Sequence, residues 1–155
     1  MHDNARLVQS LYDALGRRDG AAMAGCYARG ASFSDPVFPA LCGAEVGAMW
    51  RMLCTRAEGI RVEVAGIVAD EASGRADWQA WYAFSGTGRP VHNVIHAEFR
   101  FRDGRILTHV DDFDLWRWSR QALGAPGLLL GWSPLLRRKL RAQAASSLQK
   151  FGATR

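Results

Sequence analysis

The chain begins with apolar residues at helical spacing, which predict helices through much of its first third. Apolar side chains recur three or four positions apart before Gly16, so a first helix is expected, with Asp3 or Asn4 as its N-cap. A second, short helix is expected between a cap at Asp19 and a stop at Gly30. The stretch ASFSD, which follows it, alternates like a strand.

A third helical run begins after Gly43, and beyond it the apolar period changes to two. This alternation predicts four long strands joined by short turns, at residues 60–70, 76–84, 91–102 and 105–116. Strands joined so closely pair as antiparallel neighbours. The order of elements predicts an α+β fold, in which helices cover the concave face of a curved, cone-shaped antiparallel sheet.

The end of the chain differs from the rest in its charge. Every acidic residue lies at or before Asp114, and the remainder is basic, with a final helix expected from Pro134. We therefore predict a cone domain at residues 1–118 and a C-terminal helical extension at 119–155, packed on the same domain. An apolar stripe beside charges is typical of a surface helix, so we favour packing over binding to nucleic acid or insertion into a membrane.

Size and composition indicate one soluble domain. The 155 residues suit a single core around a small pocket. The cysteines, Cys26, Cys42 and Cys54, are odd in number and lack a CxxC spacing, and the N-terminus is not signal-like, so a cytoplasmic location is expected. No histidine spacing typical of a metal site and no glycine-rich phosphate loop occurs, so we expect neither a metal nor a cofactor.

Asp35 is the first candidate for chemistry, because it stands among apolar residues in FSDPVF, residues 33–38. An Asp-Pro pair commonly opens a surface turn. A carboxylate surrounded by apolar side chains instead loses solvation, binds its proton more tightly and can act as a general base near neutral pH. Both interpretations fit the local sequence.

The last predicted strand supplies further candidates. Strict alternation places His109, Asp111 and Phe113 on the buried face, whereas one bulge would bury Asp112 and Asp114 instead. His109 and Asp111 then form either a structural pair in the core or part of an active site.

The order helix, helix, ASFSDPVF, helix and four strands, together with the ending FRFRDGRILTHVDDFDLW, resembles the nuclear transport factor 2-like superfamily over residues 4–118. The likeness is greatest to its SnoaL-like and ketosteroid-isomerase-like members. It implies that Asp35 is a proton-transferring acid facing a pocket and that Tyr12 lies near an oxyanion-hole tyrosine. Ala97 stands where those isomerases keep a protonated aspartate, and Asp111 on the adjacent strand offers a substitute. The resemblance also implies a homodimer formed through the outer face of the sheet.

The DDFD of residues 111–114 also resembles the last-strand motif of limonene-epoxide-hydrolase-like proteins, with Asp111 at the place of their aspartate. Their arginine and second acid have no counterpart on the preceding strand, whose inner face offers Asn93, Ile95 and Ala97.

These observations predict a small protein that binds an apolar organic ligand and isomerises, cyclises or hydrolytically opens it without a cofactor. The predicted catalytic residues are Asp35, Asp111, His109 and Tyr12. The predicted substrate-binding residues are Phe33, Trp50, Tyr82, Asn93, Ala97 and Phe113. The alternative is a non-catalytic ligand-binding or protein-interaction module of the same fold, with its pocket filled by its own aromatic side chains.

Overall fold

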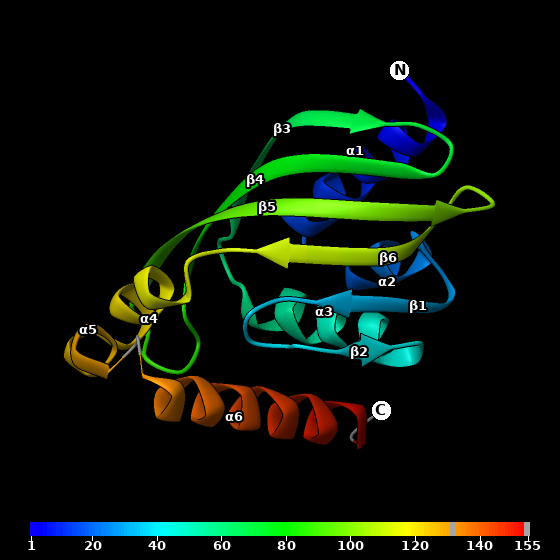
Figure 1. Ribbon diagram of the computed structural model, residues 1–155. Coiled ribbons are helices and arrows are strands. Elements are labelled where there is room, and N and C mark those ends of the chain that lie inside the picture. The colour runs from blue at the N-terminus through cyan, green and yellow to red at the C-terminus, as the bar shows by residue number, and fades with distance from the viewer. Residues whose placement is uncertain (131–132, 154–155) are drawn as a thin grey trace.

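The structure is a computed structural model that describes residues 1–130 and 133–153 (Figure 1). Within these residues the helices are α1 (Asp3–Gly16), α2 (Gly20–Gly25), α3 (Ala44–Arg56), α4 (Leu115–Leu123), α5 (Ala125–Leu130) and α6 (Pro134–Ala153). The strands are β1 (Tyr27–Ser34), β2 (Leu41–Cys42), β3 (Arg61–Ala69), β4 (Ser73–Ala83), β5 (Pro90–Arg102) and β6 (Arg105–Asp112).

The six strands form one curved, unclosed sheet in the order β2-β1-β6-β5-β4-β3. The helices α1, α2 and α3 lie together on one side of it (Figure 1), which confirms the predicted α+β fold. The pairs from β3 to β6 are antiparallel, as predicted. β1, for which the sequence analysis gave no partner, pairs with β6 in parallel. The chain leaves β1, passes through β2, α3 and the strands β3 to β5, and returns as β6 beside β1 in the same direction.

Two boundaries near the N-terminus differ from the prediction. His2 is the N-cap of α1, since its Nδ1 accepts the backbone N–H of Asn4 at 3.0 Å. Asn4 is therefore inside the helix, and its side chain donates to the carbonyl oxygens of Asp70 and Glu71. The cap of α2 at Asp19 is confirmed, but α2 ends at Gly25 and Tyr27 already belongs to β1.

The facing of the last strand is confirmed, although a bulge is present. Between β5 and β6 the register shifts, so that Phe101 pairs with Ile106 while Arg100 pairs with Thr108. The bulge therefore precedes His109, and from there the alternation is strict. His109 and Asp111 are buried, whereas Val110 is exposed.

The last strand is shorter than predicted. β6 stops at Asp112, because the side chain of Asp114 accepts the backbone N–H of Arg117 at 3.0 Å and caps α4. Leu115, which was expected to continue the strand, is the first residue of that helix.

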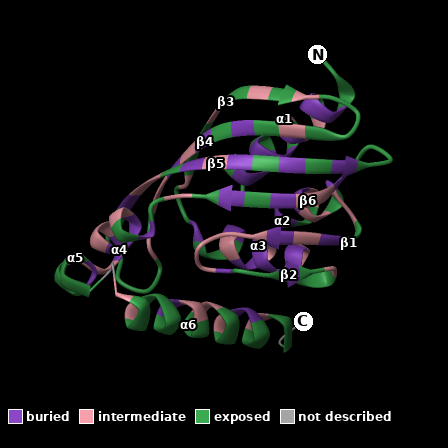
Figure 2. Cartoon of the chain, in the orientation of Figure 1, coloured by how far each residue is buried: buried purple, intermediate pink, exposed green. Residues whose placement is uncertain are grey.

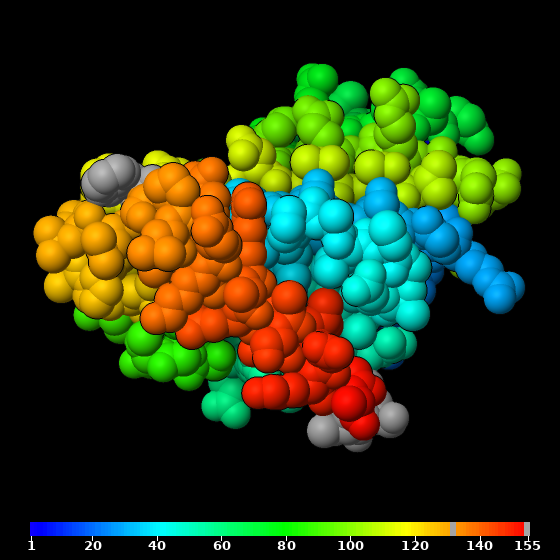
Figure 3. All heavy atoms as spheres, turned by 60° about the horizontal axis from the view of Figure 1, so that its bottom comes forward, coloured from blue at the N-terminus to red at the C-terminus, as the bar shows by residue number. Residues whose placement is uncertain are grey.

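Helix α6 packs across the open side of the cone. Figure 3 shows it, in orange to red, lying against the cyan segment that contains β2 and the start of α3. Leu148 belongs to the main core, and Leu140 joins a smaller cluster with Trp118 and Leu115. In Figure 2 buried and exposed residues alternate along the strands, and most of α6 is exposed. No helix within the described residues is long and apolar enough to cross a membrane.

Candidate active site

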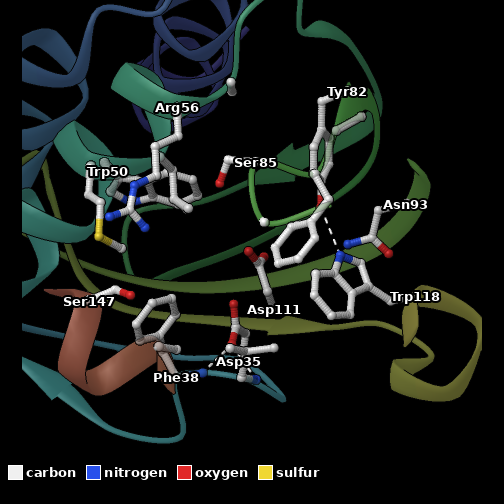
Figure 4. A pocket seen from close by; sticks show the side chains of 18 of the residues that line it. Asp35, Phe38, Trp50, Arg56, Tyr82, Ser85, Asn93, Asp111, Trp118 and Ser147 are labelled. Carbon is white, nitrogen blue, oxygen red and sulfur yellow. Dashed lines mark hydrogen bonds between the residues drawn. The ribbon is translucent and has the colours of Figure 1, made fainter. Parts of the chain in front are cut away.

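A cavity of about 520 Å³ lies between the concave face of the sheet, α3 and α6. Its size is typical of sites for small organic molecules. Most of the lining is apolar, and Asp35 and Asp111 are its acids (Figure 4). The aromatic lining residues are Phe33, Phe38, Trp50, Trp78, Tyr82, Phe84, Phe113 and Trp118.

Asp35 is both a turn residue and an acid on the cavity lining. Its Oδ1 accepts the backbone N–H groups of Val37 at 2.7 Å and Phe38 at 2.6 Å. Its own N–H donates to the carbonyl of Phe38 at 2.8 Å, which closes the turn. The other carboxyl oxygen has no hydrogen-bond partner among the described residues, and the side chain lines the cavity.

Burial raises the pKa of Asp35 from 3.8 to about 7. The backbone hydrogen bond from Phe38 opposes this rise, while the negative charge of Asp111 adds to it. A second turn in the same chain shows which effect dominates. Asp70 also accepts two backbone N–H groups, from Ala72 and Ser73, but it is exposed and these bonds lower its pKa. Desolvation therefore decides the proton affinity of Asp35.

Asp111 is held from behind by two N–H donors. His109 Nε2 lies 2.8 Å from Asp111 Oδ1, and Trp78 Nε1 lies 3.4 Å from the same oxygen. In the sheet Asp111 stands directly opposite Ala97. A carboxyl group from β6 thus occupies the place beside Ala97, where β5 itself carries only a methyl group.

A chain of hydrogen bonds sets the tautomer of His109. Trp50 Nε1 donates to the Tyr27 hydroxyl at 2.8 Å, and that hydroxyl lies 2.7 Å from His109 Nδ1. The Tyr27 proton has no other acceptor among the described residues, so it is donated to Nδ1, which must be unprotonated. The remaining ring proton is on Nε2 and points at Asp111.

Tyr27 was missed by sequence reasoning. Its spacing of six residues from Phe33 would place both on one strand face, but the expected second helix ran through it. Trp78, Trp118 and Arg56 also line the cavity and were not predicted to do so.

Two further polar groups line the cavity and have no acceptor among the described residues. The Tyr82 hydroxyl accepts Trp118 Nε1–H at 2.8 Å and keeps its own proton free to donate. Burial raises the pKa of Tyr82 to about 12, so the hydroxyl stays protonated at neutral pH. Asn93 lines the same wall from β5, and its amide has no hydrogen-bond partner within the described chain.

The cavity brings together seven of the ten predicted residues, namely Asp35, Asp111, Phe33, Trp50, Tyr82, Asn93 and Phe113. The other three are buried behind its lining. His109 is fully buried among aromatic rings, and Ala97 is buried within the sheet. Tyr12 packs on Trp78 with ring centroids 5.1 Å apart, and its buried hydroxyl has no partner in the structure described.

No group of three or more His, Cys, Asp or Glu side chains within the described residues is placed to hold a metal ion. The lining of the cavity likewise offers only two carboxyl groups, together with the exposed cations Arg56 and Lys150.

The family model of the SnoaL-like domain matches residues 8–109, which is more than half of the chain. The chain belongs to the SnoaL-like family. A search of curated proteins gives no match to this SnoaL-like chain.

Solved structures with the same fold are distant in sequence. An LEH-like epoxide hydrolase from M. tuberculosis is 21% identical, with a TM-score of 0.64 over 86% of this chain and 95% of that one. An NTF2-like protein of unknown function from Burkholderia pseudomallei is 21% identical, with a TM-score of 0.70 over 79% of this chain and 99% of that one. A protein with a ketosteroid isomerase-like fold from Catenulispora acidiphila, in complex with trimethylamine, is 15% identical. Its TM-score is 0.68 over 78% of this chain and 94% of that one. At these identities the likeness establishes the fold.

Proposed function

We propose that this protein is a cofactor-independent acid–base enzyme that removes a proton beside a carbonyl group of an apolar organic substrate. The product is then formed by isomerisation or by cyclisation. The observation that carries the proposal is Asp35, a carboxyl group on an apolar cavity with a pKa of about 7. A general base is most effective when its pKa lies near the working pH.

Asp35 is suited to be the base because one oxygen is held and the other is free. The backbone N–H groups of Val37 and Phe38 fix Oδ1, which leaves the second oxygen to face a substrate. With a pKa in this range both forms of the carboxyl group are populated near neutral pH, so the group can accept a proton and return it. Positioned acid–base groups of this kind typically contribute about 10²–10⁴-fold to a rate.

Tyr82 and Asn93 are proposed to bind the carbonyl oxygen. Removal of the neighbouring C–H proton leaves its electron pair in an enolate, whose oxygen accepts the O–H of Tyr82 and an N–H of Asn93. In an isomerisation, protonated Asp35 returns the proton to another carbon of the substrate. In a cyclisation, the enolate carbon bonds to a second carbonyl carbon, and the resulting alkoxide takes the proton.

Asp111 is proposed to raise the pKa of Asp35 through its charge and to face the substrate from the cavity floor. His109, Tyr27 and Trp50 are proposed as positioning residues for the Asp111 carboxylate. The charge of Asp111 contributes to the raised pKa of Asp35. The bond from His109 Nε2 keeps the Asp111 carboxylate in one orientation. Tyr12, predicted as an oxyanion partner, is replaced in this scheme by Tyr82, because Tyr12 does not line the cavity.

Hydrolytic opening of an epoxide has less support. The inner face of β5 presents Asn93 and Ile95 to the cavity, and neither supplies the arginine or the second acid that this chemistry uses in limonene-epoxide-hydrolase-like proteins.

The proposal is tested by hydrogen–deuterium exchange. A panel of cyclic ketones and 1,3-diketones is incubated with the protein in D₂O, and loss of the α-proton signals is followed by NMR. We expect exchange that accelerates as pH rises through about 7, the pKa of Asp35. Asp35→Asn should slow it by about 10²-fold or more.

Asp70→Asn is the matched control, because Asp70 makes the same kind of turn outside the cavity. The Asp70→Asn variant should accelerate exchange of the substrate's α-protons as much as the unaltered protein does. Equal exchange in Asp35→Asn would remove Asp35 from the mechanism. Ligands that bind in the cavity without any acceleration of exchange would favour the non-catalytic binding module.

A further inference from the structure

We infer that the substrate is an organic acid whose carboxylate is bound by Arg56 and Lys150 at the mouth of the cavity. The inference rests on the proposed function, since it names the substrate class for the same site. Arg56 is the last residue of α3, and Lys150 lies near the end of α6. Both belong to the lining of the cavity.

The lining includes polar side chains as well as its aromatic rings. Ser85 from the β4–β5 connection and Gln143, Ser146 and Ser147 from α6 belong to it together with the two cations. Lys150 follows Ser147 by three positions on α6, so the two side chains are neighbours on one helix face. In Figure 4 the guanidinium of Arg56 and the hydroxyl of Ser147 lie on one side of the cavity, away from Tyr82, Asn93 and Trp118. A ligand in the cavity therefore has these donors on one side of it.

Among the residues that the structure describes, the two cations have no partner of their own. Within the described residues neither side chain takes part in an ion pair or a hydrogen bond, although other cations of this chain do. Arg18 donates to the carbonyl oxygens of Cys54 and Thr55, and Arg141 donates to the carbonyl of Pro36. The donors of Arg56 and Lys150 are thus available to a ligand.

The acids of the cavity fix the orientation of such a ligand. Asp111 and Asp35 stand at the interior, where a second carboxylate would be repelled. The planar guanidinium of Arg56 matches a carboxylate in a two-point contact, and the ammonium of Lys150 adds charge. An acid with an apolar body therefore enters body first, which brings the body's carbonyl group toward Asp35.

Both cations are exposed, so their effect on affinity is modest. An exposed ion pair contributes a few-fold in affinity, and burial of the apolar body supplies the rest. The carboxylate contact consequently orients the ligand and makes the site prefer acids to neutral analogues.

The test uses a matched pair of probes with one apolar body, 1-pyrenebutyrate and the neutral 1-pyrenebutanol, and binding is followed by fluorescence anisotropy. We expect the acid to bind about 5-fold more tightly than the alcohol. Arg56→Gln/Lys150→Gln should remove this preference and leave the affinity for the alcohol unchanged. Arg138→Gln/Lys139→Gln removes an arginine and a lysine from α6 outside the cavity and should preserve the preference.

The outcomes separate this inference from the proposed function. Equal binding of both probes, or an equal loss in the two double variants, overturns the carboxylate site and leaves the acid–base proposal standing. Ser147→Trp places a large ring at the mouth from the surface of α6 and should weaken both probes. Unchanged binding of both probes in that variant, or no binding of either to the unaltered protein, overturns the cavity as a ligand site and the proposed function with it.

Discussion

The Tyr27 hydroxyl lies 2.7 Å from His109 Nδ1 and joins a helix to the last strand of the sheet through one oxygen atom. Trp50 on α3 donates to that oxygen, and His109 on β6 accepts from it. The ring proton on the far side of His109 is thereby directed at Asp111. A residue at the start of β1 thus controls a carboxylate in the cavity without touching it.

Tyr27→Phe should destabilise the protein by about 1–3 kcal/mol, because Trp50 Nε1–H and His109 Nδ1 lose their common partner in a buried place. Urea unfolding measures the loss, and ¹⁵N chemical shifts of the His109 ring report the tautomer. Tyr82→Phe is the control, because the Tyr82 hydroxyl accepts a hydrogen bond from Trp118 alone. Its removal should therefore lower the free energy of unfolding by less. An unchanged tautomer in Tyr27→Phe would contradict the assigned role.

Asp35→Asn should stabilise the folded protein at alkaline pH. The pKa of Asp35 is about 7 when folded and near 3.8 when unfolded, so between these values the folded state holds more protons. Stability contributed by this group is therefore lost as pH rises from about 4 to 7. Asparagine keeps an acceptor for the turn and has no charge to bury. The gain should reach about 2–4 kcal/mol at pH 8 and vanish near pH 4.

The control for that experiment has the opposite sign. Hydrogen bonds from Ser73 and Ala72 lower the pKa of Asp70, so its contribution is present above the unfolded value and lost as pH falls. Asp70→Asn should therefore weaken the protein at pH 8 and approach the unaltered protein in acid. Unfolding curves at several pH values measure the stability of both variants. Parallel pH profiles of stability for the two variants would contradict the opposite pKa shifts assigned to Asp35 and Asp70.

Leu140→Ala tests the packing of α6 on the cone, and with it the prediction that residues 119–155 are an extension packed on the same domain. Leu140 is 7% exposed and contacts the cluster around Trp118, so truncation should cost about 2–4 kcal/mol. Leu135 lies on the same helix and is 72% exposed, so Leu135→Ala should change stability by less than about 0.5 kcal/mol. Equal effects in thermal or urea unfolding would mean that α6 is detached in solution.

The homodimer stays a prediction, and the outer face of the sheet offers a test. Val94 on β5 is 45% exposed and Val110 on β6 is 41% exposed, which leaves apolar surface on that face. Val94→Arg should convert a dimer to a monomer in size-exclusion chromatography with light scattering. Leu135→Arg, away from the sheet, should not. A monomeric unaltered protein at micromolar concentration would exclude this interface.

The fold was more predictable than the site, because periodicity records which face of an element is buried. The alternation around His109 predicted its burial correctly, since one face of the sheet packs against the helices. The same pattern could not reveal that β6 stops at Asp112, because the end depends on a side-chain cap. It could not reveal the contact between Tyr27 and His109 either, which joins residues 82 positions apart.

Depth within the core was the least predictable property. Tyr12 and Ala97 are both buried, yet neither belongs to the lining of the cavity. Trp78 covers Tyr12, with ring centroids 5.1 Å apart. Whether an inward residue reaches a cavity depends on the sizes of its neighbours, which alternation does not encode.

The bond from Arg141 to the carbonyl of Pro36, 3.0 Å long, ties the covering helix to the residue that follows the acid. A guest bulky enough to push α6 outward would pull on this tether and distort the turn whose N–H groups oppose the rise in the pKa of Asp35. Entry of such a guest would therefore make Asp35 harder to ionise, whereas a guest that leaves α6 in place would meet the stronger acid.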